Sequence, residues 1–192
     1  MTPFRFGLGG FARDEDASVS VEAVLILPLL LWAFVASYTF FDVYRDKNLS
    51  LKANYAVSDL LSRETTPIDM NYLNGAAKLY KYLTRSPGSG WMRVTSVYCD
   101  QDCDLNSRRL KTHWSKATGS LPTYTDQSLR DILGPTIPWL AAGDQLIVVE
   151  TGIEYKTPFS RTFSGIGDQT LVDVVMTRPR FSQLCWGTLP PC

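Results

Sequence analysis

The chain has 192 residues, of which 45% are hydrophobic and 20% are charged, a composition typical of a folded protein and not of a disordered chain. Its Lys and Arg residues number 19 and its Asp and Glu residues number 19, so the formal net charge is +0. The chain therefore has no overall positive field, and we do not expect it to bind nucleic acid.

The first predicted element is a long helix that begins in a membrane. Residues 23–41 carry no charge, and a helix of that length extends about 28 Å, close to the hydrocarbon thickness of a bilayer. We predict a transmembrane segment at about residues 22–41. Because Pro28 is the only proline between Pro3 and Pro67 and glycine is absent from residues 11–74, the helix is expected to continue over residues 18–64. Its packed face beyond the membrane is predicted from helical spacing, at Leu49, Ala53, Ala56 and Leu60.

Two other interpretations of the apolar run remain open. A buried core helix is one, although such helices are usually shorter and keep a polar stripe. A cleaved secretory signal is the other, since residues 35–37 (VAS) are small enough for cleavage before Tyr38. The long, partly acidic segment before the run argues against a signal peptide, which normally begins with a short basic stretch.

Glu22 is the ionisable residue at the threshold of the apolar run. A carboxylate near the bilayer core costs about 2 kcal/mol or more when it has no partner. At the headgroup level, however, the dipole of a helix N-terminus favours it. The surrounding block, residues 14–31 (DEDASVSVEAVLILPLLL), resembles the start of TadE-like pseudopilins, which are minor pilin-like proteins of the tight-adherence pilus. Residues 178–181 (RPRF) resemble a tail common in these proteins.

The resemblance implies a processing site between Ala17 and Ser18, so that residues 1–17 are a prepilin-type leader. Ser18 would then be the first residue of the mature chain and Glu22 the fifth. The resemblance further implies that the new amino group pairs with the glutamate of a neighbouring subunit and sets the axial register of assembly. The implied partners are the prepilin peptidase, the pilus platform proteins, the major pilin and other minor pilins.

The chain departs from the family pattern at one position. The residue before the cut is usually Gly, whereas this chain has Ala17, so acceptance of Ala17 by the peptidase is a separate question. A competing cut after Gly10 would place Glu15 fifth. Charged residues follow that position directly and do not enter lipid readily, so the distance to the apolar run favours the cut before Ser18.

The remainder, residues 65–192, is predicted to be an α+β domain. Thr66, Pro67 and Asp69 have the residue types of a helix start. The following helix is expected to pack through Tyr72, Leu73, Ala76, Leu79, Tyr80 and Leu83. Strands are predicted at residues 92–98 and 110–117, in the alternating segment 147–155, and around Val172, Val174 and Met176. With a short helix at residues 128–133, this order predicts a pilin-like domain with an antiparallel sheet of about four strands.

Four cysteines follow the apolar run, which fits disulfides in an oxidising periplasm. Their close spacings favour Cys99 with Cys103 and Cys185 with Cys192, although four cysteines allow three pairings. A zinc site is the alternative, but the spacings do not match a known zinc motif. The charges that flank the span do not decide its orientation. The cysteines and the pilin-like start favour the bacterial inner membrane, a single pass, and a periplasmic C-terminal domain.

The sequence contains no recognisable catalytic motif. His113 is the only histidine, and we expect it to be a half-exposed strand residue. Asp100, Asp102 and Asp104 resemble the first ligands of a calcium loop, but Leu105 and Lys111 replace its glycine and bidentate acid. We therefore expect no enzyme, cofactor, metal site or small-molecule substrate, and leave weak calcium binding open.

The expected function is participation in the biogenesis of a tight-adherence pilus, through helix packing and not catalysis. The sequence is compatible with incorporation into the fibre and with a place at its base. The alternative is a single-pass, membrane-anchored periplasmic binding or interaction domain that no prepilin peptidase processes.

Overall fold

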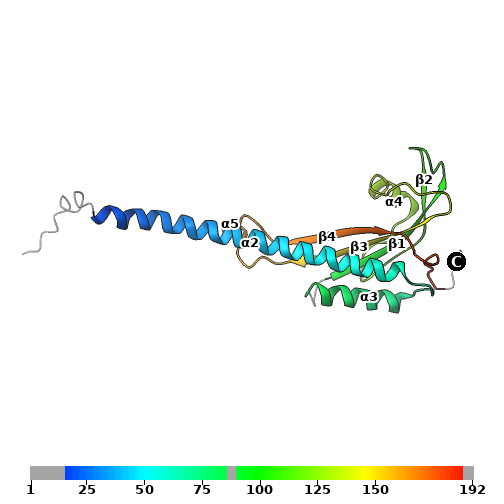
Figure 1. Cartoon of the computed structure of the whole chain (residues 1–192), viewed down its shortest axis with the longest axis horizontal. Helices are drawn as coiled ribbons and strands as arrows, with labels where there is room; N and C mark the ends of the chain where they lie inside the picture. Colours follow the sequence, from blue (N-terminus) through cyan, green and yellow to red (C-terminus); the bar gives the residue numbers. More distant parts are fainter. Residues whose placement is uncertain (1–15, 86–89, 188–192) are drawn as a thin grey trace, which may run out of the picture. The chain divides into compact units, whose positions relative to one another are not determined.

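The computed structural model describes residues 16–85 and 90–187, with side chains from Val19 onward, and the chain is an α+β protein (Figure 1). The contacts divide it into two units. The first contains the chain up to Val43 together with Thr157–Gly167. The second contains Tyr44–Lys156 and the residues from Asp168 onward. Most of the predicted leader, residues 1–15, lies outside the described residues.

The N-terminal helix α2 spans Asp16–Ser62 without interruption. The prediction of a long apolar N-terminal helix is therefore confirmed, and Pro28 lies inside it. A proline at this position removes one backbone donor, and the helix continues on both sides of it.

The face of α2 that packs in the second unit differs from the predicted one. Ala56 is exposed and Leu60 is 41% exposed, so the predicted stripe was wrong at these two positions, whereas Ala53 is buried and Leu49 is half-buried. The buried residues recur at alternating spacings of three and one, as expected for one face of a helix. They are Ser50, Ala53, Asn54, Val57, Ser58, Leu61 and Ser62, and four of these seven are polar. Hydropathy pointed to the wrong side because these polar side chains have hydrogen-bond partners inside the domain.

Helix α3 spans Met70–Leu83 and begins later than predicted. Its N-cap is Asp69, whose Oδ1 accepts a 2.8 Å hydrogen bond from the backbone N–H of Tyr72. Thr66 is not the cap, because Ile68 forms a parallel β-bridge with Trp186 and is held in extended pairing. Leu79 was predicted to be packed but is 40% exposed, and the buried residues are Leu73, Ala76, Ala77 and Tyr80.

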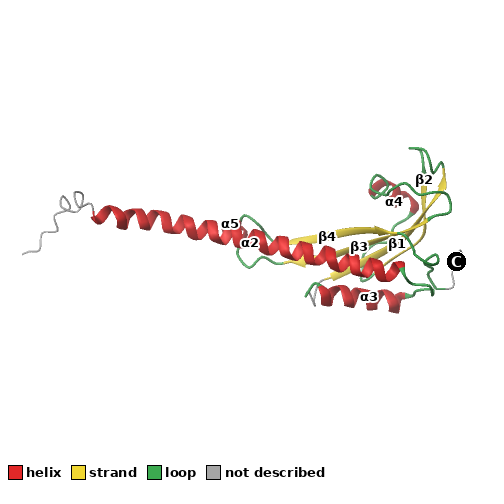
Figure 2. Ribbon diagram, in the orientation of Figure 1, coloured by secondary structure: helices red, strands yellow, loops and turns green. Residues whose placement is uncertain are grey.

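The four strands form one antiparallel sheet with the order β2-β1-β3-β4, which confirms the predicted four-stranded antiparallel sheet. The strands are β1 (Gly90–Gln101), β2 (Arg109–Ala117), β3 (Gln145–Tyr155) and β4 (Gln169–Thr177). Figure 2 shows them as the yellow arrows. The short helix α4 spans Asp126–Ile132, close to its predicted position, and Thr125 and Ser128 form a capping box at its start.

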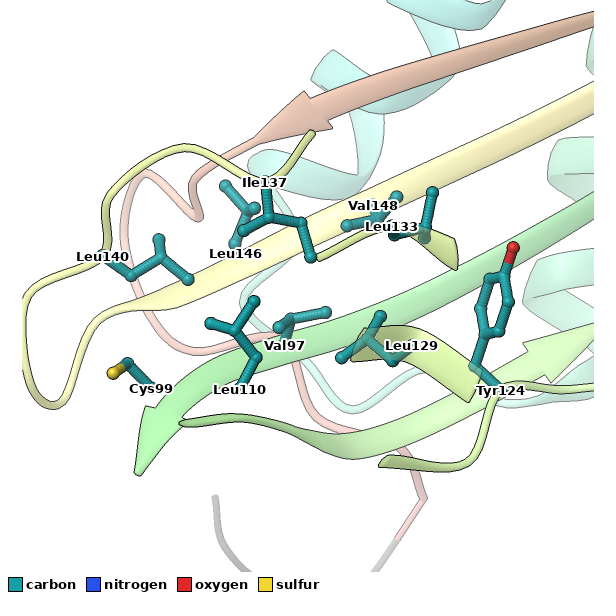
Figure 3. Close-up of a cluster of buried hydrophobic side chains, with 10 residues drawn as sticks. All are labelled: Val97, Cys99, Leu110, Tyr124, Leu129, Leu133, Ile137, Leu140, Leu146 and Val148. Carbon is teal, nitrogen blue, oxygen red and sulfur yellow. The ribbon is translucent and has the colours of Figure 1, made fainter. Parts of the chain in front are cut away.

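Both faces of the sheet are covered. On one face, Asn54 of α2 donates hydrogen bonds to the backbone oxygens of Val149 and Asp173. On the other face, α4 and the segment after it enclose a cluster of buried side chains (Figure 3), namely Val97, Cys99, Leu110, Tyr124, Leu129, Leu133, Ile137, Leu140, Leu146 and Val148. The central strand β3 is accordingly buried along nearly its whole length, which corrects the expectation of polar, exposed alternate residues.

The orientation of β4 is opposite to the one expected from its valines. Leu171, Asp173 and Val175 are buried, whereas Val172 is 44% exposed and Val174 is 41% exposed. Because successive side chains alternate between faces, the buried carboxylate of Asp173 shares the inward face with two apolar residues. Its partners, described below, explain why a charged residue occupies this face.

Candidate functional site on the N-terminal helix

The predicted processing site lies in the first turn of α2. Ala17 and Ser18 are helical there, directly after the helix begins at Asp16. Glu22 lies one turn after Ser18 and is exposed. Among the described residues, Glu22 forms no ion pair, so its role in assembly stays a prediction.

The apolar part of α2 is exposed along its length. Its large apolar side chains are 44–71% exposed from Val19 to Phe41, except for Val35, which is half-buried. Burying a single Val, Leu, Ile or Phe side chain is worth about 1.5–3 kcal/mol. Covering more than ten of them with an apolar medium is therefore worth more than the roughly 5–15 kcal/mol that stabilises a typical domain. The described part of the chain leaves this segment without such a cover.

The length of α2 is sufficient for a bilayer to provide that cover. Among the described residues, α2 is the one helix that is both long enough and apolar enough to cross a membrane. None of its most apolar stretch is buried. A single-pass membrane anchor at the N-terminal end is consistent with these features.

One face of the helix carries a shallow groove beside Glu22. The groove is lined by Val19, Glu22, Ala23, Ile26, Leu27 and Leu30, whose spacings of three and four place them on one side of an α-helix. The small side chain of Ala23 lies among larger apolar residues there. An apolar side chain from a second helix fits such a gap, and Glu22 presents a carboxylate at its edge.

A polar network that hydropathy missed connects α2 to the sheet in the second unit. Asp173 is 5% exposed and pairs with Lys47 Nζ at 2.6 Å. Its other carboxylate oxygen accepts a 2.5 Å hydrogen bond from Ser50, and Ser50 also contacts the hydroxyl of Tyr80 at 2.8 Å. The detectable sequence signal is the four-residue repeat of Ser50, Asn54, Ser58 and Ser62, which places small polar residues on one helical face.

The RPRF segment near the C-terminus meets the end of α2. The backbone N–H of Arg180 donates a 2.8 Å hydrogen bond to the oxygen of Ser62. Its guanidinium pairs with Asp59 at 2.6 Å, while Arg178 pairs with Asp144 at 3.1 Å. The segment therefore has a structural contact with the helix, which its sequence alone did not predict.

One of the two predicted disulfides is confirmed. Cys99 and Cys103 form a disulfide at the end of β1, with a Cα–Cα distance of 5.8 Å. Cys185 is not free, but Cys192 lies outside the described residues, so the predicted pairing of these two remains a prediction. No described cysteine is available as a metal ligand in thiol form.

The three aspartates of the calcium-like segment lie beside this disulfide. Asp100 pairs with Lys111 at 2.8 Å, and Asp102 has a φ of 52° in a turn closed by the N–H of Leu105. Over residues 16–85 and 90–187, no group of three His, Cys, Asp or Glu residues is arranged to hold a metal ion.

His113 lies on β2 and is half-buried, as predicted. Its ring stacks on Tyr98 with the centroids 4.1 Å apart. Burial lowers the pKa of His113 and so favours the neutral ring. These contacts give the histidine a packing role.

A second charged cluster is buried on the face of the sheet that carries α4. Arg93 donates to both oxygens of Glu150, at 2.6 and 2.9 Å, and its guanidinium lies 3.8 Å from the ring centroid of Tyr124. Tyr124 is also 3.1 Å from Glu150. Burial, followed by the charge of Glu150, raises the pKa of Tyr124 to about 12. The three groups satisfy one another and connect β1, β3 and the segment before α4.

No protein-family model, curated protein or solved structure matches this chain. The functional interpretation therefore depends on the geometry above and on the resemblance of residues 14–31.

Proposed function

We propose that this protein is a TadE-like pseudopilin that takes part in the biogenesis of a tight-adherence pilus through helix packing. In this proposal α2 anchors the chain in the bacterial inner membrane by a single pass, and the sheet domain lies in the periplasm. The disulfide between Cys99 and Cys103 supports an oxidising compartment. The partners are the prepilin peptidase, the platform proteins, the major pilin and other minor pilins.

One observation carries the proposal. A single helix joins an uncovered apolar segment, residues 23–41, to a segment that packs on a four-stranded sheet. An ordinary membrane anchor needs only the first of these. The continuation of the same helix into the core of the domain suits a subunit that assembles through its helix.

Glu22 has a specific role in this proposal. Cleavage before Ser18 creates an amino group that is mostly protonated at neutral pH. That amine on one subunit pairs with Glu22 of its neighbour, which offsets the cost of placing either charge in lipid and fixes the register. The groove lined by Ala23 and Ile26 receives an apolar side chain of the neighbouring helix.

The alternative is a membrane-anchored periplasmic interaction domain that is never processed. Ala17, which stands where the family usually has Gly, favours it. The two proposals share the membrane span and differ in the mature N-terminus.

Mass spectrometry of the N-terminal peptide, on protein extracted from membranes of the native host, tests the proposal. We expect a start at Ser18. An intact N-terminus supports the unprocessed anchor, and a start at Tyr38 supports a secreted protein, so either result contradicts the proposal. A Gly10→Leu variant is the control and should still start at Ser18, whereas Ala17→Leu should remain uncut.

A second experiment tests the register role separately. A Glu22→Ala variant should be processed normally but should fail to join the pilus machinery, measured by co-purification with the major pilin. Normal incorporation of this variant would contradict the role of Glu22 while leaving the processing result intact.

A further inference from the structure

The connection between β3 and β4 packs against the apolar helix α2. Thr157–Gly167 belongs to the same unit as the helix up to Val43. Within that unit, the rings of Phe159 and Tyr38 meet edge to face, with their centroids 6.0 Å apart (Figure 1 shows α5 beside α2). Thr39 is fully buried, and the residues three and four positions away on the same face of the helix are half-buried.

The short helix α5, Arg161–Ser164, has its polar and apolar side chains in an unusual arrangement. Ser164 is 8% exposed, whereas Phe163 is 64% exposed and Phe159 is 39% exposed. In water the opposite arrangement is favoured, because burying a Phe side chain gains free energy and exposing a serine hydroxyl costs little. An apolar medium around the loop would favour the observed arrangement.

The contact with Tyr38 places this loop at a defined depth. Tyr38 lies near the end of the uncharged run, which closes at Phe41 and is followed by Asp42. At 1.5 Å per residue, Tyr38 is about 4–5 Å from that end along the helix. If α2 spans a bilayer, the loop lies where the hydrocarbon meets the headgroups.

The composition of the loop suits that position. Aromatic residues are enriched at both membrane interfaces, and α2 adds the exposed rings of Tyr38, Phe40 and Phe41 to those of the loop. Residues 157–167 (TPFSRTFSGIG) contain one charge, that of Arg161, and no acid. Arg161 is exposed, and an arginine at this depth attracts the phosphates of lipid headgroups.

We propose that the β3–β4 loop is a second membrane contact, in which Phe159 and Phe163 enter the bilayer interface and Arg161 binds lipid phosphate. The proposal rests on the membrane span of α2 and is independent of pilus assembly. The molecule that contacts the loop in this proposal is phospholipid, because the loop continues the exposed apolar surface of the spanning helix. A second copy of the chain at this surface is the competing outcome.

The test uses the photoreactive analogue p-benzoylphenylalanine at one position at a time in the full-length protein. The protein is reconstituted in vesicles of phosphatidylethanolamine and phosphatidylglycerol, irradiated and digested, and the peptide adducts are identified by mass. Position 163 is the test and position 32, in the middle of the span, is the positive control. Position 181 is the matched control, because Phe181 is 71% exposed, follows Arg180 and lies outside the unit that contains the span.

We expect lipid adducts at positions 32 and 163 and a yield about tenfold lower at position 181. Lipid adducts at 32 but not at 163 would overturn the loop contact and leave the membrane span standing. A crosslink from 163 to a second protein copy, or equal lipid yields at 163 and 181, would overturn it as well. Absence of lipid at position 32 would overturn the span itself, and the loop contact with it.

Discussion

The carboxylate of Asp173 in β4 and the hydroxyl of Ser50 in α2 are joined by a hydrogen bond of 2.5 Å. The same carboxylate pairs with Lys47, one turn earlier in the helix. These contacts attach the helix to the edge strand of the sheet through a buried charge. Such a charge is stable only while its partners are present.

Replacing Asp173 with Ala should therefore lower the free energy of unfolding by about 3 kcal/mol, because it removes the charge-assisted bonds that Lys47 and Ser50 make to a buried carboxylate. Urea unfolding of the full-length protein in detergent micelles measures this. Glu154→Ala, at an exposed position on β3, should change the stability by less than about 0.5 kcal/mol. Equal effects of the two variants would contradict the role assigned to Asp173.

Replacing each of two glycines with alanine should change the stability of the protein in opposite directions. A Cβ atom at Gly152 would lie 2.3 Å from the ring of Trp91, whereas none of the surrounding atoms is within 4 Å of a Cβ atom at Gly75. Gly152→Ala should destabilise the protein by about 1–3 kcal/mol through overpacking. Gly75→Ala, inside α3, should stabilise it by about 0.5–1 kcal/mol. The shift of the urea midpoint measures both, and a stabilising Gly152→Ala would show that Trp91 moves freely.

The paired charges of Arg93 and Glu150 should show strong coupling. Glu150→Met leaves the guanidinium of Arg93, 12% exposed, without its carboxylate and should cost about 3–5 kcal/mol. The double variant Arg93→Met, Glu150→Met replaces both charges with apolar side chains. Its loss should be smaller than the sum of the single losses by at least about 1 kcal/mol. Additive losses in a double-mutant cycle would mean that the pair contributes no mutual stabilisation.

The stability of the protein should fall at alkaline pH through Tyr124. Its pKa is raised to about 12 in the folded protein, compared with about 10 in an unfolded chain. The unfolded chain thus loses the proton first, so the contribution is full below pH 10 and is lost as the pH rises through 12. The phenolate absorbance of the wild type minus that of Tyr124→Phe gives this pKa directly. A difference titrating near 10 would contradict the buried contact with Glu150.

The positions of the helices and strands were largely predictable from the sequence, whereas the face that each of them buries was less predictable. Periodicity located α2, α3 and all four strands because each has a long regular pattern. It failed where polar side chains are buried with partners, as at Ser50 and Asp173. The exposed valines of β4 then appeared to form the inner face. No local pattern predicts that Ile68 pairs with Trp186, so the start of α3 was placed too early.

In the candidate site, too, local features were predictable from the sequence and contacts between distant residues were not. Ala17, Ser18 and Glu22 stay predictions from the resemblance of a short block of sequence, and the position of a carboxylate before an apolar run is a local property. The contact between Phe159 and Tyr38 joins segments far apart in the chain. A single sequence does not reveal such a contact, because no motif in the residues next to Tyr38 or Phe159 indicates that the two rings meet.

The hydrogen bonds at the end of α2 have a consequence for the order of folding. Ser62 receives its bond from Arg180, and Ile68 exchanges bonds with Cys185 and Gly187. Since synthesis proceeds from the N-terminus, the partners of these early residues are made more than a hundred residues later. The end of α2 forms these bonds only after residues 180–187 have been made. A chain that stops before residue 180 therefore leaves the end of α2 without the partner of Ser62.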